Sequence, residues 1–354
     1  MRTLHRRSTS RRQQNQFQRK PVADSVHICE ESGMERSHRY PVIFNPNARS
    51  QKNGRVLQFI QRHAESLDLH TTKYAGEARE LAARFAEQGE SVVIAAGGDG
   101  TLNEVVSGLV KSNTILGVLP AGTMNVFARE IGIPCDSLEQ ALLVIERGFV
   151  QTVDLFGANG APFVQMAGVG FDALVIEETS WELKRRFGPL AYLLAAVKVL
   201  GSKSPKLEVI CVDGRREKGV AVLAGNGALY GGPFKIFPKA NNRDSKLDVI
   251  IYKEAGFRLV LDSLRGIICG GISQGHTTTY LQTSEFTVRA DHEVPVQVDG
   301  EWIGRFQEIH FIETAHHLKV LAPEAPLIGQ FSDNLKSLLQ WPRRSLQPST
   351  SQTS

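Results

Sequence analysis

The chain has 354 residues, 42% of them hydrophobic, and its four cysteines lie far apart in the sequence. This length allows two domains of ordinary size, and the cysteine spacing excludes a zinc site of paired cysteines and a small disulfide-stapled fold. No apolar run approaches the ~18–20 residues that a membrane-spanning helix needs, and the N-terminus lacks the apolar core of a secretory signal. We therefore expect a soluble, cytoplasmic protein.

The N-terminal segment is the only strongly basic part of the sequence. Residues 1–20 carry seven basic side chains and no acidic one, so the formal charge of +4 for the whole chain leaves −3 for the remainder. The low apolar content of this segment predicts a disordered arm over residues 1–38. Such an arm can contact anionic lipid or nucleic acid, or it can be an extension without a function. No motif for specific nucleic-acid recognition accompanies its charge.

From Tyr40 the sequence alternates short β-rich runs with amphipathic helices. The expected strands are 40–44, 91–96 and 115–119, and the expected helices are 56–67, 77–88, 102–109, a short one ending at 129, and 137–147. Ser137 and Gln140 form a capping box, and Gly89 and Gly148 are expected to end helices. This alternation predicts a doubly wound α/β domain with a parallel sheet over residues 39–150.

Beyond residue 150 the hydrophobic period becomes that of strands. The strand candidates are 163–167, 206–212, 219–225, 246–252, 285–290, 294–300 and 306–312, and helices are expected near 173–200 and 257–271. This pattern predicts a mostly antiparallel, β-sandwich-like domain over residues 151–323. The remaining residues, 324–354, are rich in Ser, Gln and Pro and are expected to form a flexible tail.

The most informative local motif is Gly97-Gly98-Asp99-Gly100-Thr101, which joins a buried strand to the start of a helix. Glycines allow the backbone to approach phosphate closely, and a helix N-terminus offers unpaired N–H groups and a partial positive charge. The motif therefore predicts a nucleotide phosphate site. A tight strand–helix turn without a ligand is the alternative.

Two further motifs follow in order: LPAGTMNVFAR at 119–129 and AGVGFDALV at 167–175. Together with GGDGT they resemble the signature of the diacylglycerol kinase catalytic-domain family, which is related to sphingosine kinases and more distantly to NAD kinases. The motifs at 119–129 and 167–175 are similar to segments of the lipid-kinase branch of that family. The resemblance runs from the first strand nearly to the C-terminus, and it implies an ATP-binding first domain and a lipid-substrate second domain.

The resemblance also implies the nucleotide site. Asn45 to Arg49 is similar to the family's loop after its first strand, and Thr72 is similar to a threonine of its nucleotide pocket. The residues that would surround ATP are Asn45, Pro46, Asn47, Ala48, Arg49, Thr72, Gly97, Gly98, Asp99, Gly100, Thr101, Leu102, Asn103 and Thr123. Asp99 is the expected anchor of catalytic Mg²⁺, because a hard cation beside phosphates prefers carboxylate oxygen. Its alternative role is to cap the N–H groups of its own loop.

Two segments of the second domain look like further family motifs. PKANNRDSKLDV (238–249) resembles a segment that binds a structural Mg²⁺ in bacterial members, which implies Asn241, Asp244 and the Lys246 carbonyl as ligands. Ser245 stands where the family has glycine, so an ordinary Asx-type turn is the alternative. VDGEWIG (298–304) resembles the motif that implies Glu301 as general base with Asp299 beside it. Asp299-Gly300 is also a good hairpin turn, and both interpretations can hold together.

Besides Ser245, two positions depart from the family pattern. Arg49 replaces a glycine, so a guanidinium contact can substitute for close backbone approach to phosphate. Val126 replaces an aspartate, which we expect to affect rate and substrate more than fold.

The expected function is Mg²⁺-dependent transfer of the γ-phosphate of ATP to a hydroxyl of diacylglycerol or a related lipid, at a membrane surface that the protein contacts peripherally. Residues 188–201 are a candidate for that contact, or a helix facing the core. The alternatives are a kinase for a soluble acceptor and a non-catalytic nucleotide-binding regulator. The resemblance is also compatible with a homodimer.

Overall fold

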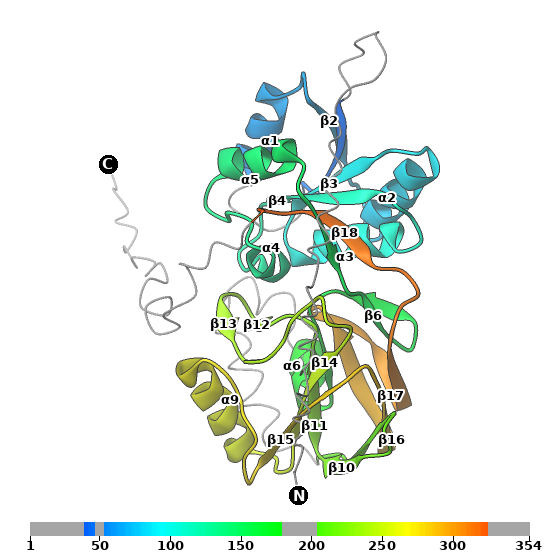
Figure 1. Ribbon diagram of the computed structural model, residues 1–354, viewed down its shortest axis with the longest axis vertical. Coiled ribbons are helices and arrows are strands. Elements are labelled where there is room, and N and C mark those ends of the chain that lie inside the picture. Colours follow the sequence, from blue (N-terminus) through cyan, green and yellow to red (C-terminus); the bar gives the residue numbers. More distant parts are fainter. Residues whose placement is uncertain (1–38, 47–52, 179–203, 325–354) are drawn as a thin grey trace, which may run out of the picture.

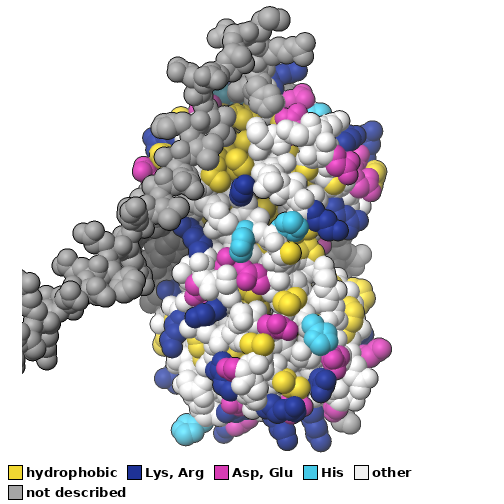
Figure 2. Space-filling view, turned by 45° about the vertical axis from the view of Figure 1, so that its right-hand side comes forward, with side chains coloured by type: hydrophobic (Ala, Val, Ile, Leu, Met, Phe, Trp, Pro, Cys, Tyr) yellow, Lys and Arg dark blue, Asp and Glu magenta, His cyan; other side chains and the backbone are white. Residues whose placement is uncertain are grey.

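Two lobes, each built on its own sheet, make up the computed structural model, which describes residues 39–46, 53–178 and 204–324 (Figure 1). The predicted basic arm, the C-terminal tail beyond residue 324 and the segment 188–201 lie outside these residues. Within the described part of the chain, no helix is long and apolar enough to cross a membrane. Charged side chains of both signs are spread over both lobes on the face drawn in Figure 2.

The first lobe contains a six-stranded sheet in the order β2-β1-β3-β4-β18-β5. Its strands are β1 (Tyr40–Phe44), β2 (Leu67–Thr71), β3 (Val92–Gly97), β4 (Ile115–Pro120), β5 (Val150–Val153) and β18 (Leu318–Leu321). Its helices are α1 (Asn53–Arg62), α2 (Glu77–Glu87), α3 (Asp99–Leu109), α4 (Val126–Glu130) and α5 (Leu138–Arg147). The strands β1 to β4 and β18 pair in parallel, and only β5 is antiparallel. The predicted α/β domain is therefore confirmed.

Local signals set several boundaries of this lobe as predicted. Ser137 accepts a hydrogen bond from the Gln140 N–H at 3.2 Å and caps α5, while Gly148 ends it with φ 70°. The strand β3 is buried at every position, because helices cover both faces of the sheet. The predicted helix 56–67 is wrong at its end: α1 stops at Arg62 and Leu67 begins β2, an edge strand whose polar residues concealed it.

The second lobe is a ten-stranded sheet in which every pairing is antiparallel. Its strands are β6 (Phe156–Ala158), β7 (Ala161–Phe163), β8 (Met166–Val169), β9 (Leu207–Cys211), β10 (Arg216–Gly219), β11 (Ala221–Gly225), β14 (Leu247–Tyr252), β15 (Thr278–Thr283), β16 (Glu285–Val298) and β17 (Glu301–Glu313). A small ribbon, β12 (Leu229–Tyr230) with β13 (Phe234–Lys235), and two helices, α6 (Phe171–Glu178) and α9 (Phe257–Cys269), complete the described part of this lobe. The predicted antiparallel domain is confirmed.

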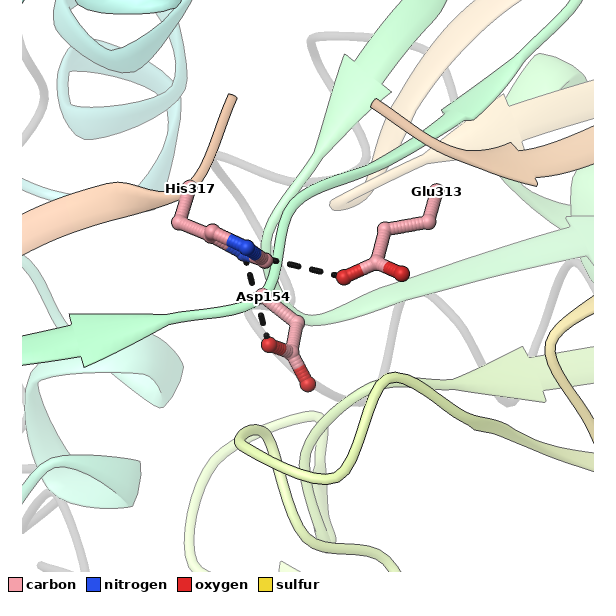
Figure 3. A group of neighbouring side chains, drawn as sticks. All are labelled: Asp154, Glu313 and His317. Atoms are coloured by element: carbon pink, nitrogen blue, oxygen red, sulfur yellow. Dashed lines mark ion pairs between the residues drawn. The ribbon is translucent and has the colours of Figure 1, made fainter. Parts of the chain in front are cut away.

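Two connections join the lobes and lie side by side. One leads from β5 to β6 through Asp154, and the other leads from Glu313 at the end of β17 to His317 before β18. The His317 Nδ1 atom lies 3.6 Å from Asp154 Oδ1 and 3.6 Å from Glu313 Oε1 (Figure 3). We predicted that residues 151–323 form the second domain, whereas β18 and β5 both belong to the first sheet. Short strands carry no sequence signal for the sheet that they join, so the chain's return to the first lobe was not foreseen.

Candidate active site

The GGDGT loop packs backbone against backbone on the loop that follows β4. The Ala121 N–H donates to the Gly97 carbonyl at 2.8 Å. A Cβ built on Gly122 would lie 2.5 Å from Gly98 Cα, and one built on Gly97 would lie 2.6 Å from Thr101 Cβ. A side chain at Gly122 would separate the two loops, and one at Gly97 would collide with Thr101 of its own loop. The glycines are therefore required by close approach, and together they leave a backbone cradle at the carboxyl edge of β3 and β4.

Asp99, the first residue of α3, bridges from this loop to α4. Its Oδ1 atom accepts the Val126 N–H at 2.7 Å. Burial raises the pKa of Asp99, and the backbone N–H groups of Val126, Phe127 and Asn125 oppose that rise. The carboxylate thus caps α4, and the backbone N–H of Asp99 itself, in its own loop, also lowers the pKa. Because the Val126 contact uses the main chain, the replacement of aspartate by valine at this position leaves it intact.

Asn125 holds the turn before α4 in a left-handed conformation, with φ 49°. It is only 3% exposed, accepts the Gly122 N–H at 2.9 Å and donates to the Gly122 carbonyl at 3.0 Å. Asparagine tolerates this backbone conformation better than most residues. The cradle is therefore fixed on both sides.

The described members of the predicted nucleotide site lie at the ends of four neighbouring strands. Asn45 and Pro46 follow β1, Thr72 follows β2, and Thr123 follows β4, while Gly97 ends β3 and residues 98–103 follow it. Parallel strands place their carboxyl ends at one edge, and open α/β sheets bind ligands there. Asn47, Ala48 and Arg49 lie outside the described residues.

The individual members of this predicted nucleotide site differ in their burial and contacts. Thr72 is buried and donates its N–H to the Phe44 carbonyl at 2.9 Å. The buried Asn103 Oδ1 has no hydrogen-bond partner within the described part of the chain. Leu102 and Thr123 line the cavity described below.

The hairpin between β16 and β17 brings the second lobe to the same place. Asp299 and Gly300 both have positive φ, 48° and 85°, which is the conformation of a tight type I′ turn. The predicted hairpin is therefore confirmed. Glu301 follows it, and a Cβ built on Gly100 would lie 3.1 Å from Glu301 Oε1. The carboxylate thus faces the glycine loop from across the interlobe boundary.

Asp299 uses both carboxylate oxygens to hold this hairpin against residues 164–166, which lead into β8. Oδ2 accepts the Val164 N–H at 2.9 Å, and Oδ1 accepts those of Gln165 at 3.0 Å and Met166 at 2.9 Å. Burial raises the pKa of Asp299 to about 6 despite these hydrogen bonds, and the charge of Asp99 adds to the rise. This geometry gives Asp299 a positioning role. The family resemblance implies Asp299 beside the general base Glu301, and these hydrogen bonds show what holds Asp299 in that place.

The raised pKa of Asp299 predicts a pH-dependent stability. Its folded-state pKa of about 6 exceeds the ordinary 3.8, so this group favours folding most below about pH 4, and that contribution is lost as pH rises through about 6. At roughly 1.4 kcal/mol per pKa unit, the loss in free energy of unfolding should be about 2–3 kcal/mol. Urea unfolding of the parent and Asp299→Asn between pH 4 and 7.5 checks this. Parallel pH profiles for the two proteins would contradict it.

One cavity of about 590 Å³ connects the two lobes. At its polar end lie Gly98, Asp99, Gly100 and Glu301. The rest extends into the second lobe between α6, α9 and the sheet, and its apolar lining includes Val175, Ile176, Ala221, Leu223, Phe234, Ile236, Leu259, Ile267 and Ile272. The site therefore combines a phosphate-type loop with an apolar chamber.

Sequence reasoning missed a polar cluster in the wall of this cavity. The Asp172 carboxylate accepts hydrogen bonds from the Tyr230 hydroxyl and from Gln297 Nε2, the latter at 2.8 Å. Gln297 is fully buried, and its Oε1 atom accepts the Gly300 N–H at 2.8 Å. Burial raises the pKa of Asp172. The GFDA motif was the available signal, but its partners lie 58 and 125 residues away in the sequence.

Two family models match the chain in tandem. The one described as diacylglycerol kinase catalytic domain matches residues 39–158, and the one described as YegS C-terminal NAD kinase beta sandwich-like domain matches residues 165–321. A diacylglycerol kinase of Bacillus subtilis (strain 168) is 30% identical over 298 residues, which cover 81% of this chain and 97% of that protein. The chain belongs to the diacylglycerol kinase family.

A second relative and a solved structure show the same likeness over most of this chain. A diacylglycerol kinase of Staphylococcus saprophyticus is 30% identical over 300 residues, covering 80% of this chain and 95% of that protein. A crystal structure of one of the diacylglycerol kinases from Bacillus anthracis str. Sterne superposes with a TM-score of 0.64 at 22% identity, covering 82% of this chain and 98% of that one. At this identity the likeness shows the shared two-lobed fold.

The loop for which the family resemblance implies a structural Mg²⁺ keeps the turn that a glycine would make. Ser245 has φ 55°, in the left-handed region, and its N–H donates to Asp154 Oδ2 at 2.7 Å. Its hydroxyl donates to Glu313 Oε1 at 3.0 Å. Asp244 accepts the Lys246 N–H at 3.2 Å, which is an Asx-type turn, and burial raises the pKa of Asp244. The Asn241 carbonyl accepts the Arg243 N–H at 2.7 Å.

The three predicted ligands Asn241, Asp244 and Lys246 thus share one short loop beside the interlobe connections. Within the residues that the structure describes, a second group of donors adjoins it, because atoms of Asp154, Glu313 and His317 lie within 4.8 Å of one another. The hydrogen bonds and ion pairs already described account for that group.

Proposed function

We propose that the protein is an ATP- and Mg²⁺-dependent lipid kinase that phosphorylates a hydroxyl of diacylglycerol or a related lipid. The observation that carries the proposal is a continuous cavity, which joins the glycine loop and Glu301 to an apolar chamber. Its volume of about 590 Å³ falls in the ~300–1,000 Å³ range of small-molecule sites. Family membership supports the kinase activity, and the apolar lining supports a lipid acceptor over a soluble one.

The first lobe would bind the nucleotide. The cradle formed by Gly97, Gly98 and Gly122 has room only for backbone, which suits phosphate oxygens approached by N–H groups at the start of α3. Asp99, at the mouth of the cradle, would hold Mg²⁺, which would neutralise charge on the phosphates. Its Oδ1 is already fixed by the Val126 N–H, so the carboxylate is positioned before a ligand arrives.

The second lobe would present the acceptor. Glu301 would take the proton of the lipid hydroxyl while the hydroxyl oxygen bonds to the γ-phosphorus. The bond from that phosphorus to the β–γ bridging oxygen breaks, and ADP leaves. The hairpin anchored by Asp299 keeps Glu301 facing the glycine loop. Positioning of this kind accounts for most of the rate in phosphoryl transfer.

The test is transfer of labelled γ-phosphate from ATP to lipids of different headgroup and chain length in mixed micelles. We expect label in one lipid class. Label in a soluble hydroxyl compound alone, or no transfer despite ATP binding, would contradict the proposal.

The same assay checks the apolar chamber through Ala221→Phe. Ala221 is buried on β11 and lines the chamber, so a phenyl ring there should obstruct acyl chains. We expect kcat/KM to fall about tenfold or more for a long-chain acceptor, which is roughly 1.4 kcal/mol, and much less for a short-chain one. The short-chain acceptor is the internal control. Equal losses for both would place the acyl chains elsewhere.

A further inference from the structure

The outer side of α9 carries a stripe of exposed apolar side chains. Phe257 is 71% exposed, and Leu261, Leu264 and Ile268 are each 50% exposed. Steps of four, three and four residues place them along one side of the helix. We call these four residues the α9 stripe. Figure 1 shows α9 at the outside of the second lobe, away from the first.

The α9 stripe is continuous with the wall of the cavity. Val260 and Ile267, which line the cavity and are only partly buried, lie four residues before and three residues after Leu264. At these spacings they are neighbours of Leu264 on the helix surface. Leu259 and Ser263 follow on the inner side. One apolar surface therefore runs from the interior of the cavity around α9 to the outside of the protein.

The opposite edge of the stripe is basic. Arg258 and Arg265 are exposed and lie three residues before and four residues after Leu261. Arg258 also forms an exposed ion pair with Glu254 at 2.9 Å. An apolar stripe bordered by arginines is the pattern of a helix that lies in a bilayer interface, with its cations at anionic headgroups.

The dimensions favour a bilayer over a second copy of the chain. Four side chains exposed by half to seven-tenths offer roughly 400 Å² of apolar surface, about half of the ~800 Å² that each partner buries in a standard protein interface. With 13 residues α9 is about 20 Å long, which is too short to cross a hydrocarbon core of about 30 Å. A helix of this size can rest in one leaflet.

We propose that α9 docks the protein on the membrane: the α9 stripe inserts among acyl chains, Arg258 and Arg265 face anionic headgroups, and lipid enters the cavity past Val260 and Ile267. The entry path rests on the proposed lipid kinase function. The docking itself does not, because it can be measured without turnover.

The experiment uses the full chain and vesicles of phosphatidylcholine with phosphatidylglycerol, pelleted in 0.5 M salt. At that salt the Debye length is only about 4 Å, so attraction by exposed charges, including the N-terminal arm, is largely screened. The double variant Leu261→Gln, Leu264→Gln should lower the partition coefficient about tenfold or more. Leu143→Gln is the matched control, because Leu143 is 51% exposed on α5 of the first lobe, and it should bind as the parent does.

Activity of the same proteins separates the two proposals. We expect the double variant to keep its rate with a short-chain acceptor dissolved in water and to lose it with lipid in vesicles. Reduced vesicle binding with no lipid phosphorylated by any protein would refute the kinase and leave the docking standing. Vesicle binding equal to that of the parent, or no binding by the parent, would overturn the docking. So would a change from dimer to monomer in sedimentation with unchanged vesicle binding, which would assign the stripe to a second copy.

Discussion

Replacement of Glu301 by glutamine should lower kcat for lipid phosphorylation by about 10²–10⁴-fold, the range that a positioned general base contributes. The amide keeps the size of the side chain but cannot accept the proton of the acceptor hydroxyl. Glu301 is exposed beside Gly100, and the hairpin that carries it is held by Asp299, so the fold should survive the change. The measurement is single-turnover transfer of label from ATP, together with the KM for ATP.

The matched control is Glu293→Gln, which alters another exposed glutamate on β16, the strand before Glu301. It should keep the activity of the parent. We also expect ATP binding by Glu301→Gln to stay within about twofold, because the residue belongs to the acceptor side of the site. If Glu301→Gln transferred phosphate at the rate of the parent, another group would have to remove the proton.

Much of the fold could be predicted from the sequence, because interactions between residues close together in the chain determine it. The uninterrupted apolar run of β3 follows from burial on both faces, and the Ser137 cap and Gly148 mark the two ends of α5. The hairpin turn at Asp299-Gly300 could be predicted in the same way, since both residues tolerate positive φ. These features depend on residues close together in the chain.

Features that depend on residues far apart in the chain could not be predicted from the sequence. Asp299 binds the N–H groups of residues 164–166, more than 130 positions earlier, so its sequence neighbours gave no sign that both oxygens were occupied. Likewise β15, with the sequence TTYLQT, lacks the apolar alternation that would reveal a strand. The glycine-like turn at Ser245 depends on hydrogen bonds to Asp154 and Glu313 that only the fold brings near.

The α9 helix was predicted, but its functional meaning needed the structure. Its amphipathic pattern indicates one buried side and cannot say that this side faces a cavity rather than a packed core. The membrane contact that the sequence suggested, residues 188–201, lies outside the described residues. The structure instead directs attention to α9, where the exposed stripe and the cavity wall adjoin.

Asp99→Asn should reduce kcat/KM by about 10²–10³-fold while leaving stability unchanged or slightly higher. The asparagine Oδ1 atom can still accept the Val126 N–H, so the cap on α4 remains, but the charge that would hold Mg²⁺ is lost. Because burial raises the pKa of Asp99, a neutral side chain also avoids the cost of burying a charge. Thermal unfolding and Mg²⁺ titration of the activity are the two measurements.

Asp99→Ala separates the two roles of this carboxylate. Alanine removes both the charge and the acceptor for the Val126 N–H, so it should lose the activity and also about 0.5–2 kcal/mol of stability, the usual value of an N-terminal helix cap. If Asp99→Asn kept its activity and only Asp99→Ala lost it, the residue would serve α4 alone. Mg²⁺ would then have to be held by other groups at the edge of the sheet. We expect both variants to be inactive and only Asp99→Ala to be destabilised. That result would show that the hydrogen bond of the carboxylate stabilises the fold and that its charge serves catalysis.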